Sequence, residues 1–269
     1  MNIKTAPLWQ WILMVVVSFV LAVFAYGFIV VSGEILQAPW VRVVCSLVVI
    51  ALYVFFVRWF EKEWARDILQ LRGAADLLLG LAVGVVFFVL VVALMLLFGC
   101  CTVEKLGFDW PRQLSALCMF FGVAVGEEVI FRGILFRWID RRWGLTAALI
   151  VSALIFGLIH ITNDNATLWG AIAIAVEAGL LLGAAYKWSG TLWLPIGIHW
   201  AWNYTQGNIF GFAVSGNDAG SSFLRVVADG PDLLTGGAFG AEASLLSVLL
   251  GLAFAALFLW LHLRKKGVN

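Results

Sequence analysis

Charged residues are scarce in this sequence of 269 residues. Asp, Glu, Lys and Arg together make up 12% of it, whereas 63% of the residues are hydrophobic. A soluble globular domain carries about 25% charged residues. With a mean hydropathy of +1.02, this scarcity excludes an ordinary soluble protein. It predicts an all-α, polytopic transmembrane helical bundle that forms a single integral membrane domain over residues 1–269.

Cysteine pairs and clusters of basic residues are also missing. The four cysteines include no C-x-x-C spacing, so the sequence indicates neither a thiolate metal site nor a disulfide framework. The formal net charge is +1, and no basic run alternates with aromatic residues that could stack on bases. Nucleic acid is therefore not an expected partner, whereas the lipid bilayer is. The sequence does not indicate an oligomeric state.

The apolar residues are grouped in runs of about 20, the length that crosses a bilayer as a helix. The first run follows Lys4 and is longer than the roughly 7 to 15 apolar residues of a secretory leader, so we expect it to be retained. Tryptophan lies near the ends of most runs, as is typical of membrane interfaces. About eight spans are predicted, near residues 8–31, 40–60, 75–98, 113–138, 145–162, 167–187, 191–211 and 242–263.

The loops between these spans differ in basic residues. With the N-terminus in the cytoplasm, only four of the 17 Lys and Arg residues fall on the other side: Arg42, Lys105, Arg112 and Arg225. Because cytoplasmic loops are enriched in Lys and Arg, we expect both termini to be cytoplasmic. The glycine-rich segment near 212–241 then becomes an external loop, and its composition predicts flexibility without packing of its own.

Ionisable residues inside a span are costly, so they indicate a functional site by default. Glu128 and Arg132 are four residues apart and could form a structural pair on one helix face. Glu127 is turned about 100° from Glu128 and needs another partner. A helical rise of about 1.5 Å per residue places polar residues of spans four, five and seven at overlapping depths. The candidate site residues are Glu127, Glu128, Arg132, His160, His199 and Asn203.

The chemistry of these side chains favours amide hydrolysis. A carboxylate held away from bulk water can take a proton from a water molecule and pass it to a leaving amine, and a histidine beside it can hold that water. His199 and Asn203 share a helix face and are donors of the kind that stabilise an oxyanion. No serine or cysteine has a placed base, so direct attack by water is favoured over a covalent intermediate.

Three motifs in order resemble the CPBP family of intramembrane proteases, which are the CAAX proteases and bacteriocin-processing enzymes, related to type II CAAX prenyl endopeptidases. They are Glu127-Glu128-x-x-x-Arg132, Phe156-x-x-x-His160 and His199-x-x-x-Asn203. The resemblance covers about 113–210, which is the expected catalytic core. It implies that Glu127 activates water with His160, that Glu128 and Arg132 orient this site, and that His199 and Asn203 serve the oxyanion.

The resemblance leaves the cofactor open, because the family has been described both as metalloproteases and as glutamate-dependent proteases. We favour the mechanism without a cofactor. The alternative is zinc, for which Glu127, His160 and His199 would supply three ligands and leave one position open.

The expected function is that of an intramembrane endopeptidase acting on a membrane-associated peptide or protein, with a site reached from the cytoplasmic half. One alternative is a proton-coupled transporter in which Glu127, Glu177 and the histidines relay protons. Another is a non-catalytic membrane scaffold. Glu177, a further acid in the sixth span, either makes a structural hydrogen bond or lines the site. The substrate cannot be named from the sequence.

Overall fold

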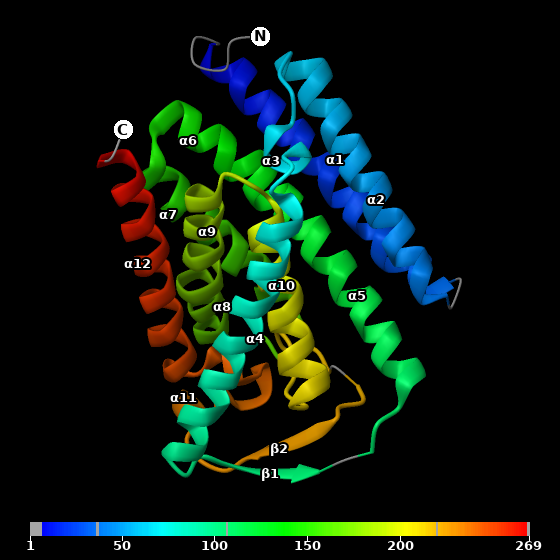
Figure 1. The fold of residues 1–269 in the computed structure, drawn as a ribbon, viewed down its shortest axis with the longest axis vertical. Coiled ribbons are helices and arrows are strands. Elements are labelled where there is room, and N and C mark those ends of the chain that lie inside the picture. The colour runs from blue at the N-terminus through cyan, green and yellow to red at the C-terminus, as the bar shows by residue number, and fades with distance from the viewer. Residues whose placement is uncertain (1–6, 36–37, 106, 219, 268–269) are drawn as a thin grey trace.

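The computed structural model describes residues 7–35, 38–105, 107–218 and 220–267, which form a bundle of helices with a small sheet at one end (Figure 1). The main helices are α1 (Leu8–Ile35), α2 (Pro39–Phe56), α4 (Gly73–Leu97), α5 (Trp110–Glu128), α7 (Leu145–Ile159), α8 (Leu168–Ile174), α9 (Leu180–Ser189), α10 (Trp193–Tyr204) and α12 (Leu245–Gly267). Shorter helices are α3 (Arg66–Leu69), α6 (Arg137–Trp143) and α11 (Asp232–Thr235). The predicted all-α class is confirmed.

Several α-helices continue into or are followed by segments of π-helix or 3₁₀-helix. The π-helices are η1 (Val57–Glu61), η2 (Val129–Phe136), η4 (Ala175–Gly179) and η5 (Thr205–Ile209), and the 3₁₀ turns are η3 (His160–Thr162), η6 (Gly237–Phe239) and η7 (Ala241–Ala243). Three of the π-helices continue α5, α8 and α10, which carry or adjoin the candidate site residues. Such segments often occur at functional sites.

Six helical segments within the described residues are long and apolar enough to cross a membrane: Pro39–Trp59, Gly73–Leu97, Trp110–Trp143, Leu145–Thr162, Leu168–Ser189 and Leu245–Lys265. They match the expected spans two to six and eight. The expected first span lies on α1, where a shorter apolar stretch is found at Val16–Phe28. The expected seventh span corresponds to α10 and η5, of 12 and five residues. The total of eight is therefore not confirmed.

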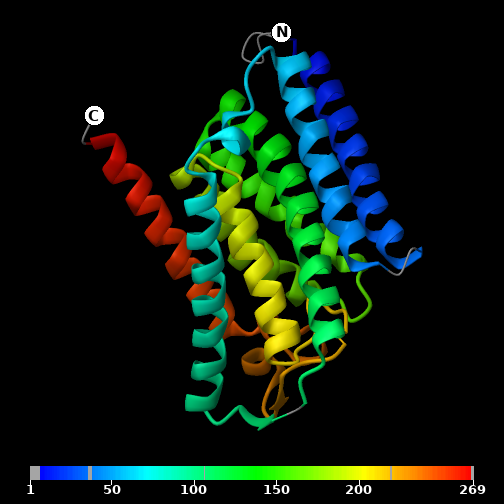
Figure 2. The ribbon, with the colours of Figure 1, turned by 45° about the vertical axis from the view of Figure 1, so that its right-hand side comes forward.

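Helix α10 lies inside the bundle, between α4 and α5 (Figure 2). Its approach to α4 depends on glycine, because a Cβ atom added at Gly80 or Gly84 would lie 2.4 Å from a backbone oxygen of α10. Gly197 on α10 has the same relation to α4, at 2.5 Å from the oxygen of Leu77. This contact fixes the helix that carries His199, and it agrees with the use of small residues to bring membrane helices together.

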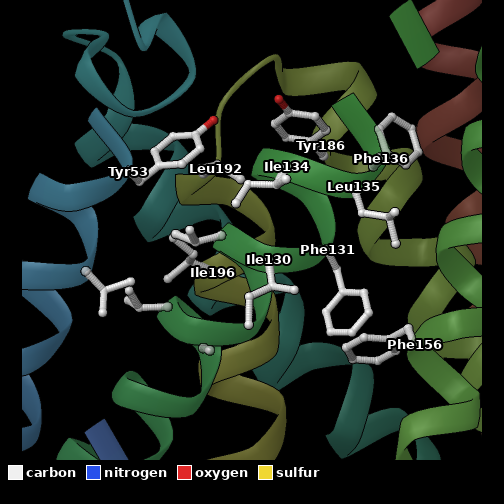
Figure 3. Close-up of a cluster of buried hydrophobic side chains, with 14 of the residues drawn as sticks. Tyr53, Ile130, Phe131, Ile134, Leu135, Phe136, Phe156, Tyr186, Leu192 and Ile196 are labelled. Atoms are coloured by element: carbon white, nitrogen blue, oxygen red, sulfur yellow. The ribbon is translucent and has the colours of Figure 1, made fainter. Parts of the chain in front are cut away.

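The centre of the bundle is filled by the segment that contains η2. All residues from Ala124 to Ile139 are buried, so this helix is surrounded by protein on every side. Figure 3 shows part of this core, in which Phe131 lies beside Phe156 with their rings edge to face and 4.9 Å between centroids. The charged residues of the first motif are held within this packed region.

The residues between η5 and α12 form a folded unit, which we call the cap (residues 211–218 and 220–244). Strand β2 (Leu224–Ala228) pairs antiparallel with β1 (Cys101–Lys105), so that Cys101 lies opposite Ala228. Phe239 is 2% exposed and packs over Gly170. The expectation of a loop without packing is therefore wrong. Glycines with positive φ, such as Gly236 at +84° and Gly240 at +117°, turn the chain so that its aromatic residues point inward.

Basic residues lie mainly at the end of the bundle opposite the cap, where α1 begins and α12 ends (Figure 1). We call these two ends the basic end and the cap end. The basic end carries Arg58, Lys62, Arg66, Arg72, Arg137, Arg141, Arg142, Lys187, Arg264, Lys265 and Lys266. The cap end carries Arg42, Lys105, Arg112 and Arg225. Lys4, which also supported the expected orientation, lies outside the described residues.

Candidate active site

Glu128 and Arg132 form a fully buried ion pair. The Arg132 Nη1 donates to Glu128 Oε1 at 2.8 Å, and both side chains are 0% exposed. The other guanidinium nitrogen, Nη2, donates to the backbone oxygens of Ala178 and Gly179 in η4, at 3.3 Å each. A buried pair requires such additional hydrogen bonds, because desolvation can exceed the attraction between the charges.

His199 joins this pair to the rest of the site. Its Nδ1 donates to the same Glu128 oxygen at 2.9 Å, so Glu128 Oε1 accepts from both Arg132 and His199. With Nδ1 engaged, Nε2 points toward Glu127, whose Oε2 lies 3.9 Å away. The carboxylate on Nδ1 therefore fixes the orientation of the ring, as buried partners of functional histidines commonly do.

Phe156, the first residue of the second motif, packs against several of these groups. Its ring lies under the Arg132 guanidinium, with 4.6 Å from Cζ to the ring centroid. It also contacts the rings of His160 and His199, at centroid distances of 4.9 and 6.1 Å. The aromatic face attracts the guanidinium, whose Nε has no hydrogen-bond partner among the described residues. The ring also holds both histidines in place.

His160 is the first residue of η3, at the point where α7 ends. Its Nδ1 lies 2.6 Å from the backbone oxygen of Phe156, which can only accept a hydrogen bond. The hydrogen of a neutral imidazole is therefore on Nδ1, and Nε2 keeps its lone pair. The side chain is 8% exposed, so it is buried but reaches the edge of a cavity.

Glu127 is less enclosed than its neighbour Glu128. Its Oε1 accepts a hydrogen bond of 3.3 Å from the hydroxyl of Tyr26 on α1. Its Oε2 has no hydrogen-bond partner among the described residues. Tyr26 can approach because residue 126 is glycine: a Cβ there would lie 2.3 Å from the tyrosine ring. Sequence reasoning missed Tyr26, although the glycine before Glu127 is consistent with a close contact at this point.

Four of the six candidate residues line a common cavity of about 690 Å³: Glu127, His160, His199 and Asn203. Glu128 and Arg132, which are fully buried, lie behind it. The structure thus brings the acid, imidazole and amide side chains of three separate helices to one place. It places the two remaining residues where they contact the site without facing the cavity.

The cavity has its polar rim at the cap end. Residues of this rim come from the start of α2, from the loop after η3 and from the cap: Arg42, Thr162, Asn163, Ser215, Asn217 and Asp218. The cap end is opposite the basic end, which the predicted orientation places in the cytoplasm (Figure 1). We expected from the sequence that the site is reached from the cytoplasmic half. With both termini in the cytoplasm, as predicted, the polar rim of the cavity instead lies on the opposite side of the membrane.

Residues 109–205 match the family model described as type II CAAX prenyl endopeptidase Rce1-like. This match confirms the resemblance to the CPBP proteases, and all six candidate residues lie inside the matched segment. It supports a membrane endopeptidase of the CAAX type in general, and it does not favour the transporter or the scaffold. No curated protein and no solved structure gives a significant match to the chain.

Outside the Rce1-like segment, the cap contributes a buried acid, Glu242 in η7. It is 3% exposed, accepts a hydrogen bond from the backbone N–H of Ser215, and lines a small adjoining cavity of about 20 Å³ with His199 and Asn203. Burial raises the pKa of Glu242 to about 7, because desolvation outweighs the hydrogen bond from Ser215 and the attraction of His199. Sequence reasoning missed this residue, because it stands at the start of an expected span.

Glu177 belongs to neither cavity lining. It is 0% exposed and packs against α12, where a Cβ added at Gly251 would lie 2.6 Å from its own Cβ. Glu177 therefore does not line the site, although it lies within the Rce1-like segment.

The residues considered as zinc ligands do not form a metal-binding group. In the part of the chain that the structure describes, no three His, Cys, Asp or Glu side chains are arranged to hold a metal ion. Zinc takes three or four such ligands at about 2.0 to 2.3 Å. Glu127, His160 and His199 share the cavity, and the choice between a metal-free and a zinc-dependent mechanism stays a prediction.

Proposed function

We propose that this chain is an intramembrane endopeptidase that hydrolyses a peptide bond of a membrane-associated peptide or protein, with water activated by Glu127 and His160. The observation that carries the proposal is that Glu127, whose buried Oε2 has no hydrogen-bond partner among the described residues, lines the same cavity as two histidines and an asparagine. A carboxylate that is buried and only partly hydrogen-bonded is suited to accept a proton from a reactant.

The proposed roles follow from the hydrogen bonds of each ring. His160 has its Nδ1 hydrogen on Phe156 and offers the Nε2 lone pair, so it can hold one hydrogen of the attacking water. Glu127 takes the other proton and later passes it to the leaving amine. The water oxygen bonds to the carbonyl carbon, and the C–N bond then breaks.

His199 and Asn203 are proposed to stabilise the oxyanion. Because Nδ1 of His199 already donates to Glu128, the ring can donate through Nε2 only when both nitrogens carry hydrogen. Glu127 and Glu128 flank the ring and supply the counter-charge for that form. Arg132 holds Glu128 in position and is thus a positioning residue.

The activity is tested by comparing peptide termini in membranes of cells that carry the intact chain or one of three variants. We expect Glu127→Gln and His160→Ala to lose the cleavage products, because each removes a group that contacts the water. The control Glu104→Gln removes a carboxylate from the exposed strand β1 and should keep them. Unchanged products with both site variants, at equal protein levels, would contradict the proposal.

The cofactor is tested with the purified chain. We expect cleavage to continue in the presence of a strong zinc chelator, because the proposed mechanism uses no metal. Loss of activity that returns on adding zinc would contradict this part of the proposal.

A further inference from the structure

The side of the membrane from which the cavity is reached can be inferred from charge and geometry together. The basic end carries eleven Lys and Arg residues in the described chain, and the cap end carries four. Because basic residues near the ends of spans are retained in the cytoplasm, this imbalance orients the basic end toward the cytoplasm. The cap end then faces the extracytoplasmic side.

The polar part of the cavity rim lies entirely on elements of the cap end. Asn217 and Asp218 of the cap are exposed, and so is Thr162 at the end of η3. Arg42, three residues after the start of α2, completes this rim. These side chains offer hydrogen-bond donors and acceptors to a peptide backbone that arrives through aqueous solution.

A second part of the lining is apolar and exposed. Val23 on α1 and Ile159 on α7 line the cavity, yet they are 46% and 39% exposed on the outer surface of the bundle. In a bilayer this surface faces hydrocarbon, so an apolar segment can reach the cavity sideways. The cavity lining therefore combines apolar residues that are also exposed on the lipid-facing surface with a polar rim at the cap end.

The depth of Glu127 fits this arrangement. Glu127 is near the middle of the 34-residue helical segment Trp110–Trp143. At about 1.5 Å per residue it lies roughly 25 Å from either end of that segment. The path from the basic end is filled by the buried pair of Glu128 and Arg132. The hydrophobic core around Phe131 also lies there, as Figure 3 shows.

We propose that the substrate enters from the extracytoplasmic side: it is a peptide with an apolar segment in the bilayer and a polar segment outside the cytoplasm, and not a cytosolic C-terminal tail. This inference rests on the proposed function for the cleavage itself. The entry side, however, is a property of the fold and can be measured without activity.

The orientation is tested with single cysteines outside the cavity lining. Leu71→Cys lies at the basic end on a residue that is 103% exposed, and Ala238→Cys lies on the exposed surface of the cap. We expect a membrane-impermeant maleimide to label Ala238→Cys in intact cells and Leu71→Cys only after permeabilisation. The unsubstituted chain, with its four native cysteines, gives the background. The opposite labelling pattern would overturn the inference.

Access is tested with a third variant, Asn217→Cys, on the rim. Once cleavage products are known, the same maleimide added to intact cells should lower their formation at least tenfold in Asn217→Cys and leave Leu71→Cys unchanged. Undiminished cleavage after complete labelling of residue 217 would overturn the inference. Labelling of the same cysteines is also measured in chains that carry Glu127→Gln, because it does not require activity. The expected labelling pattern without cleavage by any chain, including the one with an intact Glu127, would contradict the proposed function but not the entry side.

Discussion

Glu127 and Glu128 are neighbours in the chain, but they lie in two different environments. Glu128 is 0% exposed and accepts hydrogen bonds from Arg132 and His199. Glu127 is 8% exposed, receives one long hydrogen bond from Tyr26, and lines the cavity. One carboxylate is held through its Oε1 by two buried side chains and lies behind the cavity, whereas the other lines the cavity.

We therefore expect substitution of Glu128 to affect mainly the stability of the fold, and substitution of Glu127 to affect mainly the reaction. Removing the charge of Glu128 leaves another charge buried without its partner, which destabilises the fold. Removing the charge of Glu127 leaves the packing intact and deletes the proposed base. The variants below test this difference.

The largest effect is expected for the activity of Glu127→Gln. The amide keeps the shape of the side chain but cannot accept the proton of water, so the rate of cleavage should fall about 100- to 10,000-fold. The thermal unfolding midpoint in detergent should stay close to that of the control Glu104→Gln. A strongly lowered midpoint would show that Glu127 is structural, and the comparison would then fail.

Glu128→Gln should mainly reduce stability. It leaves the Arg132 guanidinium in a fully buried position without its carboxylate, at a cost of about 3 to 5 kcal/mol in the free energy of unfolding. The double variant Glu128→Gln with Arg132→Met removes both charges and should recover part of that loss. Equal unfolding curves for Glu128→Gln and the parent chain would refute the assignment.

The cap is expected to make stability depend on pH through Glu242. Its pKa rises from 4.5 in the unfolded chain to about 7 in the fold, so the folded state favours the protonated acid. Stability should therefore fall as pH rises from about 4.5 to 7, by about 3 kcal/mol when the shift is fully expressed. His199 and Glu177 also face this acid.

Glu242→Gln should flatten this dependence, because the amide does not titrate. The measurement is the unfolding midpoint of both proteins between pH 5 and 8, with Glu104→Gln as the control. Parallel pH curves for Glu242→Gln and the parent chain would contradict the buried environment of this acid.

The smallest effect is expected for Tyr26→Phe. The substitution removes one hydrogen bond of 3.3 Å to Glu127 and keeps the ring that packs on Gly126. A loss of about 1 kcal/mol corresponds to an activity reduced roughly fivefold. Activity lost as completely as in Glu127→Gln would instead make Tyr26 part of the reaction.

Much of the helical framework could be predicted from the sequence. The expected span 145–162 coincides with Leu145–Thr162, and 75–98 differs little from Gly73–Leu97. Long apolar runs in a bilayer leave the chain few alternatives to a helix. The π-helices could not be predicted, because their hydrogen bonding responds to tertiary contacts such as those of Arg132 with η4.

The cap was the largest error, and it has a physical reason. Glycine-rich composition predicts turns, but it does not show that the turns bring distant residues such as Phe212 and Phe239 into a buried position. For the site, the motif residues could be grouped because their spacing pairs them on helix faces and the helical rise places them at overlapping depths. Tyr26 could not, since it stands alone and is 101 positions from Glu127.

The anchoring of Arg132 to the carbonyls of Ala178 and Gly179 has an evolutionary consequence. Backbone oxygens are present whatever side chains a helix carries, so drift in the composition of η4 leaves this anchor untouched. Loss or gain of one residue there is different, because it turns the following helix by about 100° and withdraws both acceptors. The anchor should accordingly persist through changes of side chain while the length of η4 stays fixed, although Gly179 itself is held by packing, since a Cβ atom there would lie 2.8 Å from the Cα and Cβ atoms of Ala153.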